Sequence, residues 1–293
     1  MKKSLLLLGV VALLFSSCKK EDENESPVSS AENGPYLVLK FHFDEDQERL
    51  DNFGNPSVIP AGNAAQTPQF NSLSAHYAEL IPNANTWLGD GEVIYEGPET
   101  TAGGDLAIDF DQAVLAGEGE VFQRIPLSSI SAGTYEYLRM SLSYQNYNIA
   151  LQANGFDLQG TLAGFIGYNN YITSYTIEGD EVAVNGNKLQ GYWGFETNFG
   201  VVEGQAPEGA TTVVNPLWDT SPIPAGSCLV TGLFPEALQI TGTETQDIVV
   251  QVSLSVNNSF EWIDGNSDGI YQPGDNEQVV DMGIRGMIPM VQD

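Results

Sequence analysis

Oxygen-bearing side chains alternate with other residues in one short segment of the sequence, residues 264–275, which read DGNSDGIYQPGD. Asp264, Asn266 and Asp268 stand at every second position, and Gly269 follows them. Short carboxylate and amide side chains in this spacing can wrap one hard cation, and Ca²⁺ takes about six to eight oxygen ligands at about 2.3–2.6 Å. The segment therefore predicts a calcium loop; an ordinary Asp/Asn/Gly-rich surface turn is the alternative.

Read position by position, this segment resembles the calcium loop of EF-hand proteins. The resemblance implies a ligand set of Asp264, Asn266, Asp268, the backbone carbonyl of Ile270, and Asp275. The last position holds Asp where the family has a bidentate Glu, so we expect weak affinity unless Glu277 or Asp281 contributes. The flanking residues are typical of strands, and we expect the loop to lie on a β scaffold.

The sequence contains only two histidines, His42 and His76. It lacks His-x-His, His-Glu-x-x-His and Cys-x-x-Cys, and therefore predicts no catalytic zinc site. Copper binding would require the two histidines to meet in space, and a solvated or hydrogen-bonded histidine is the alternative for each. Gly-x-Ser-x-Gly, Gly-x-Gly-x-x-Gly and Walker patterns are also absent, so we expect a protein without enzymatic activity.

The N-terminal residues have the pattern of a secretory signal, because Lys2 and Lys3 precede an apolar stretch too short to span a bilayer. The stretch ends in Ser16-Ser17-Cys18, which resembles the lipobox of bacterial lipoproteins. The resemblance implies that residues 1–17 are removed and that Cys18 carries acyl chains, including palmitate, which anchor the protein to a membrane. A plain secretory signal is the alternative.

Residues 18–34 are polar and acidic and predict a flexible tether. Within them, Lys20-Glu21-Asp22 is similar to the export tag of surface lipoproteins of the Bacteroidota. The similarity implies an outer-membrane protein that is exposed on the cell surface. An ordinary solvated tether is the alternative.

The chain carries 10 basic and 39 acidic residues, a formal net charge of −29. This charge argues against nucleic acid as a partner, because phosphates require Lys and Arg contacts. A metal or a glycan remains a possible ligand. Aromatic residues concentrate between residues 144 and 195, where exposed rings would stack on sugars; a strand core rich in aromatics is the alternative.

Alternating apolar residues predict strands over residues 37–43, 134–144 and 247–256. The pairs Asn154-Gly155 and Asn185-Gly186 predict tight hairpins, because both residues accept positive φ. Residues 73–80 fit a helix or a strand. With 31 glycines and 15 prolines, long helices have little room. We expect an all-β fold over residues 35–293, an antiparallel β-sandwich with a β-barrel as the alternative.

The segments at 37–43, 73–80 and 132–140 resemble, in their order, the MbnP-like copper-binding domain. The resemblance implies copper binding, with His42 and His76 as the histidine candidates. The glycine-valine-proline stretch of that family is absent here. Taken together, the sequence predicts a lipid-anchored extracytoplasmic binding or structural protein with a calcium-stabilised β domain; a copper-binding protein, a glycan-binding lipoprotein and a hydrolase are the alternatives.

Overall fold

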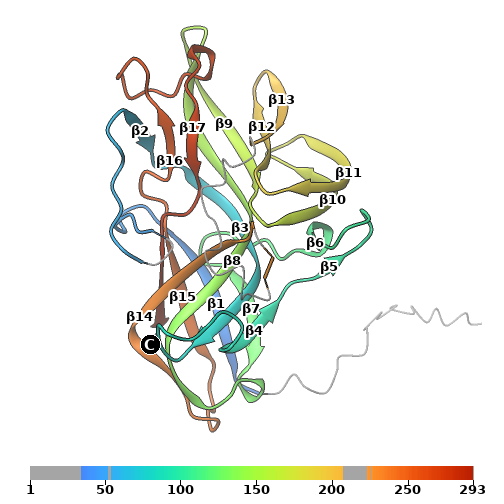
Figure 1. The fold of residues 1–293 in the computed structure, drawn as a ribbon, viewed down its shortest axis with the longest axis vertical. Coiled ribbons are helices and arrows are strands. Elements are labelled where there is room, and N and C mark those ends of the chain that lie inside the picture. The colour runs from blue at the N-terminus through green and yellow to red at the C-terminus, as the bar shows by residue number, and fades with distance from the viewer. Residues whose placement is uncertain (1–33, 52–53, 207–222, 225, 293) are drawn as a thin grey trace, which may run out of the picture. The chain divides into compact units, whose positions relative to one another are not determined.

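Strands form nearly all the regular structure of this protein. The computed structural model describes residues 34–51, 54–206, 223–224 and 226–292 (Figure 1). Within these ranges the only helices are short 3₁₀ turns, among them η1 (Phe110–Gln112), η2 (Leu127–Ser129) and η4 (Pro273–Asp275). None of the described helices has both the length and the apolar character that a membrane crossing needs.

A four-stranded sheet joins segments far apart in the sequence. Its order is β18-β15-β1-β7, with β1 (Tyr36–Asp44), β7 (Val121–Pro126), β15 (Ile248–Ser255) and β18 (Met287–Gln292). The alternation predicted for β1 is confirmed, because Leu37, Leu39 and Phe41 are fully buried. β1 runs parallel to β15 and antiparallel to β7.

A larger antiparallel sheet is built around β8 (Gly133–Ala153), which pairs with three strands. The order is β13-β12-β9-β8-β3-β4, and β14 also pairs with β8. The other strands are β3 (Gln69–Ile81), β4 (Glu92–Glu96), β9 (Phe156–Phe165), β12 (Tyr192–Thr197), β13 (Gly200–Gln205) and β14 (Cys228–Ile240). Residues 73–80, which fit either a helix or a strand, therefore lie in a strand.

Two smaller sheets complete the described fold. One has the order β17-β16-β2, with β2 (Asn63–Gln66), β16 (Phe260–Ile263) and β17 (Val279–Met282). The other has the order β11-β10-β6-β5, with β5 (Glu99–Thr100), β6 (Ala107–Asp109), β10 (Asn169–Thr176) and β11 (Glu181–Leu189). The first of these sheets carries the predicted calcium loop.

The main core lies between the two large sheets. Leu39 and Val252 of the four-stranded sheet belong to the same buried cluster as Leu73, Leu138 and Val230 of the larger sheet. Two sheets that share one apolar core form a sandwich. The all-β sandwich predicted from the sequence is therefore confirmed. Most strand pairs are antiparallel; the β1–β15 pair and the β10–β6 pair are parallel.

The two asparagine-glycine pairs behave differently. Asn154 and Gly155 have φ values of 51° and 78° and form the predicted turn between β8 and β9. The hairpin predicted at Asn185-Gly186 is wrong. Asn185 has a positive φ of 52°, but it lies inside β11, where the register against β10 shifts by one residue. The pair thus forms a bulge, because a bulge accepts the same left-handed backbone as a turn.

Candidate metal centre

A strand hairpin positions the predicted calcium loop. β16 and β17 pair antiparallel, and the backbone N–H of Ile263 donates to the carbonyl of Gln278 at 2.9 Å. The N–H of Asp264 donates to the carbonyl of Gly62 at 3.1 Å. The two ends of the loop are therefore held by backbone hydrogen bonds, and its flanks are strands, as the sequence predicts.

The first half of the loop folds around the carboxylate of Asp264. Its oxygens accept hydrogen bonds from the backbone N–H groups of Ser267 at 2.8 Å and Gly269 at 2.9 Å. Gly269 has a φ of 74°, a conformation that glycine adopts without steric cost. The sharp turn predicted at Gly269 is confirmed. These backbone hydrogen bonds hold the Asp264 carboxylate in place without a bound ion.

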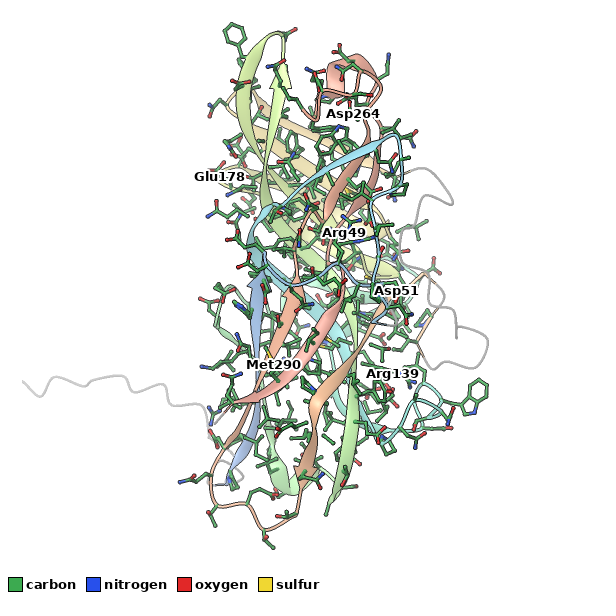
Figure 2. All side chains as sticks on the ribbon, turned by 90° about the vertical axis from the view of Figure 1, so that its left-hand side faces the viewer. Arg49, Asp51, Arg139, Glu178, Asp264 and Met290 are labelled. Carbon is green, nitrogen blue, oxygen red and sulfur yellow. The ribbon has the colours of Figure 1, made fainter. Side chains whose placement is uncertain are left out.

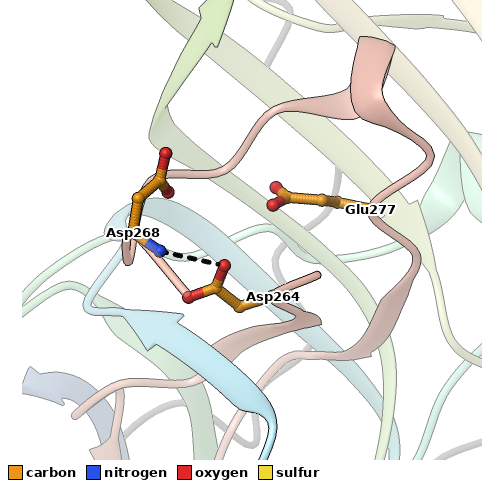
Figure 3. A group of neighbouring side chains, drawn as sticks. All are labelled: Asp264, Asp268 and Glu277. Atoms are coloured by element: carbon orange, nitrogen blue, oxygen red, sulfur yellow. Dashed lines mark hydrogen bonds between the residues drawn. The ribbon is translucent and has the colours of Figure 1, made fainter. Parts of the chain in front are cut away.

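Three carboxylates converge at this loop. Asp264, Asp268 and Glu277 each offer an oxygen, and these oxygens all lie within 4.8 Å of one another (Figure 3). In the part of the chain that the structure describes, they form the one group of three or more His, Cys, Asp or Glu side chains with this spacing. Carboxylate oxygens in such a cluster are the ligand type that Ca²⁺ and Mg²⁺ prefer.

Glu277 differs from the two aspartates because its side chain is buried, with 7 % of its surface exposed. One carboxylate oxygen, Oε2, accepts a hydrogen bond from the N–H of Gln272 at 2.6 Å. The other, Oε1, is buried and has no hydrogen-bond partner. Burial raises the pKa of Glu277, and the charges of Asp264, Asp268 and Asp275 raise it further. A cation would remove this repulsion and satisfy Oε1.

The other residues predicted as calcium ligands lie around this cluster. The side-chain nitrogen of Asn266 donates to Oδ2 of Asp268 at 3.1 Å. Ile270 donates its backbone N–H to Oδ1 of Asp268 at 2.8 Å. Asp275 lies in η4 and is exposed, outside the convergent group. Asp281, the second candidate helper, forms an ion pair with Arg285.

The spacing of the EF-hand loop predicts Asp275 as the last ligand. In the structure, Glu277 rather than Asp275 lies close to Asp264 and Asp268. In a helix–loop–helix site the twelfth residue returns to the ion at the start of the second helix. Here the loop is closed by a strand hairpin, and Glu277 stands two residues before β17 begins. The useful signal in the sequence is therefore an acid immediately before the second strand, not a fixed count from Asp264.

The two histidines have unrelated surroundings. His42 is half-buried, and its Nδ1 lies 2.6 Å from the carboxylate of Glu118. His76 is buried, and neither of its ring nitrogens has a hydrogen-bond partner. Burial lowers the pKa of His76 to about 4. Its ring packs edge-on against Tyr168, with the ring centroids 5.6 Å apart. Neither histidine belongs to the group of convergent ligands.

The aromatic residues between 144 and 195 contribute mainly to the core. Tyr144, Tyr175 and Tyr192 pack against Phe165 and are buried. Trp193 is partly buried and offers no fully exposed ring. These contacts are those of a strand core rich in aromatics.

Comparison of the chain with protein-family models, with curated protein sequences and with solved structures finds no match. The predicted signal segment, the acylation site at Cys18 and the tether up to residue 33 lie outside the described residues. The second cysteine, Cys228, is a buried thiol on β14, and burial raises its pKa to about 12. A neutral, buried thiol is unreactive.

Proposed function

We propose that this protein is a lipid-anchored, extracytoplasmic binding or structural protein whose β domain is stabilised by calcium. The observation that carries the calcium part is the convergence of Asp264, Asp268 and Glu277 around one buried, unpartnered carboxylate oxygen. The anchoring part is supported by Ser16-Ser17-Cys18 after the apolar N-terminal stretch. Surface exposure is supported by Lys20-Glu21-Asp22.

Calcium acts here by linking the two strands of a hairpin. Asp264 follows β16 directly, and Glu277 precedes β17, so an ion held by both ties together the two ends of the loop that connects these strands. Without an ion, like charges crowd in one loop and oppose its folded conformation. An ion that binds only the native state adds RT ln(1 + [L]/Kd), about 2.7 kcal/mol when calcium is a hundredfold above Kd.

The expected affinity is that of extracellular calcium modules, with Kd on the order of 10⁻⁴–10⁻³ M. Few negatively charged ligands and an exposed loop favour this weak range over that of cytosolic sensors. Such an affinity suffices outside the cytoplasm, where calcium is not kept scarce. The role of the ion is therefore structural rather than regulatory.

The experiment is a thermal melt of the tether-free domain with millimolar calcium and with chelator. The melting temperature should rise with calcium and fall with chelator. Asp264→Ala and Asp268→Ala should each abolish the difference, whereas Glu236→Ala, at an exposed acid on β14, should retain it. If neither calcium nor chelator changed the melting temperature of the wild type, the calcium proposal would be wrong and the loop would be an ordinary surface turn.

A further inference from the structure

A cavity of about 830 Å³ lies between the large sheet and the calcium-loop hairpin. Its walls come from β8, β9, β12 and β13 on one side and from β16, β17 and the residues after β17 on the other, strands that occupy the upper part of Figure 1. Small-molecule sites in proteins have volumes of about 300–1,000 Å³. The cavity is therefore large enough for a ligand of considerable size.

The walls of this cavity are mainly apolar. Ile149, Leu151 and Leu162 line it from the sheet, and Val279 and Met282 line it from the hairpin. Protein interiors are packed to a density of about 0.74, and atoms that line an unfilled apolar space lose dispersion contacts. A mainly apolar ligand would restore those contacts.

Two buried amide oxygens in the lining lack partners. Oε1 of Gln145 and Oε1 of Gln190 are both buried without a hydrogen bond. Their nitrogens are engaged: Gln145 donates to the carbonyl of Met282, and Gln190 donates to the carbonyl of Ile166 at 2.9 Å. These bonds fix each amide with its oxygen as the unused atom. A buried acceptor without a donor is unfavourable, so a ligand with a donor is favoured.

The charges around the cavity exclude a strongly charged ligand. Among the described residues that line the cavity, Asp281 is the only ionisable acid or base other than Tyr271 and Cys228, and Arg285 neutralises it through an ion pair. These described lining residues include no lysine or arginine to receive a carboxylate or phosphate. The complementary ligand is neutral.

The β12–β13 hairpin places exposed apolar side chains at the border of the cavity. Phe199 and Val202 line the cavity, and 81 % and 57 % of their surfaces are exposed. Apolar side chains that border a cavity and also face solvent mark an entrance for an apolar molecule.

We infer that this cavity binds a neutral lipid alcohol, with its hydroxyl donating to Gln145 or Gln190 and its chain against the apolar walls. Burial of the chain against these walls would strengthen binding with each added CH₂ group. The inference rests on residues other than the three carboxylates of the calcium proposal and is independent of it.

The test uses the neutral dye Nile red as a fluorescent probe of the cavity in the wild-type domain with calcium present. 1-Decanol should displace the dye, whereas decanoate and decyl methyl ether should need at least tenfold higher concentrations. Decanoate lacks a neutral head group and the ether lacks a donor. Equal displacement by all three compounds, or no dye binding by the folded domain, would overturn the inference.

Variants locate the binding in this cavity. Val279→Trp fills the cavity and should weaken dye binding at least tenfold, whereas Val58→Trp, at a residue that is 83 % exposed and outside the lining, should leave it unchanged. Gln145→Leu/Gln190→Leu removes both acceptor oxygens and should retain the dye but lose the preference for decanol over the ether. A preference that persists in Gln145→Leu/Gln190→Leu would refute the hydroxyl assignment even if Val279→Trp fails to fold.

Discussion

The guanidinium of Arg49, which is labelled in Figure 2, lies 2.7 Å from the carboxylate of Glu261. Both side chains are buried. Glu261 belongs to β16, the strand that leads into the calcium loop. Its second oxygen accepts a hydrogen bond from Asn63 at 2.6 Å, and Arg49 also donates to the carbonyl of Asn258. This pair fixes the strand on which Asp264 depends.

Breaking this buried pair should be costly. Arg49→Met should lower the free energy of unfolding by about 3–5 kcal/mol, because it leaves the Glu261 carboxylate buried without a counter-charge. The matched control is Arg124→Met, which breaks an exposed pair with Asp247 and should cost no more than about 1 kcal/mol. Urea denaturation measures both. Equal losses in the two variants would contradict the role assigned to burial, and Arg49→Met/Glu261→Met should recover most of the loss.

Substitutions of Glu277 and of Asp275 should differ in their effect on the calcium-dependent rise in melting temperature. If the convergent geometry holds the ion, Glu277→Gln should abolish the calcium-dependent rise in melting temperature, and Asp275→Asn should reduce it only slightly. In chelator, Glu277→Gln should melt no lower than wild type, because it removes a buried charge that neighbouring carboxylates repel. The reverse ranking of the two variants would favour the spacing of a helix–loop–helix site.

His76 should make the domain sensitive to mild acid. Its pKa is lowered from 6.5 to about 4 by burial, so between these values the unfolded chain binds a proton that the folded chain does not. The free energy of unfolding should therefore fall as the pH is lowered from about 6.5 to about 4, by up to about 3 kcal/mol from this group. Above pH 6.5 the contribution is constant.

The check is chemical denaturation at several pH values for wild type and His76→Phe. The difference between the two curves should change across the window from pH 6.5 to 4 and remain flat above it. Curves that run parallel throughout would show that the pKa of His76 is the same in the folded and unfolded states, and would contradict the prediction.

Cys18 should be the acylated N-terminus of the mature protein. Mass spectrometry of protein extracted from membranes should find lipid mass on Cys18 and no residues before it. Cys18→Ala should yield soluble or unprocessed protein, whereas Cys228→Ala should remain membrane-bound. Protease treatment of intact cells should remove the domain if it is displayed on the surface; protection until the outer membrane is lysed would place it facing the periplasm.

The sequence predicts strands well where one face is buried and poorly where both are. In β1 the alternation of Leu37, Leu39 and Phe41 is visible because the other face is partly exposed. In β3, residues from Leu73 to Ile81 are buried almost throughout, so no alternation exists to separate a strand from a helix. β8 extends beyond the predicted 134–144 to Ala153, and in this extension Tyr147, Ile149 and Leu151 are buried while the residues between them are less so.

The candidate sites divide in a similar way. Asp264 and Asp268 are close in sequence, and their spacing alone predicts that they share a turn. Glu277 joins them only because β16 and β17 pair, which is a tertiary fact. The cavity was not predictable, because Gln145 and Val279 approach through strands that are separated by more than a hundred positions in the sequence.

The parallel pairing of β1 with β15 has a consequence for the order of folding. Leu37 lies opposite Ile248, so β1 pairs with a strand that is synthesised about two hundred residues later. The other neighbour of β1, β7, is synthesised earlier, but it pairs with only one of the two edges of β1. Contacts of such long sequence separation slow folding, and an unpaired apolar strand is prone to aggregate while it waits. The folding chain should accordingly benefit from a chaperone that shields β1 until β15 has been synthesised.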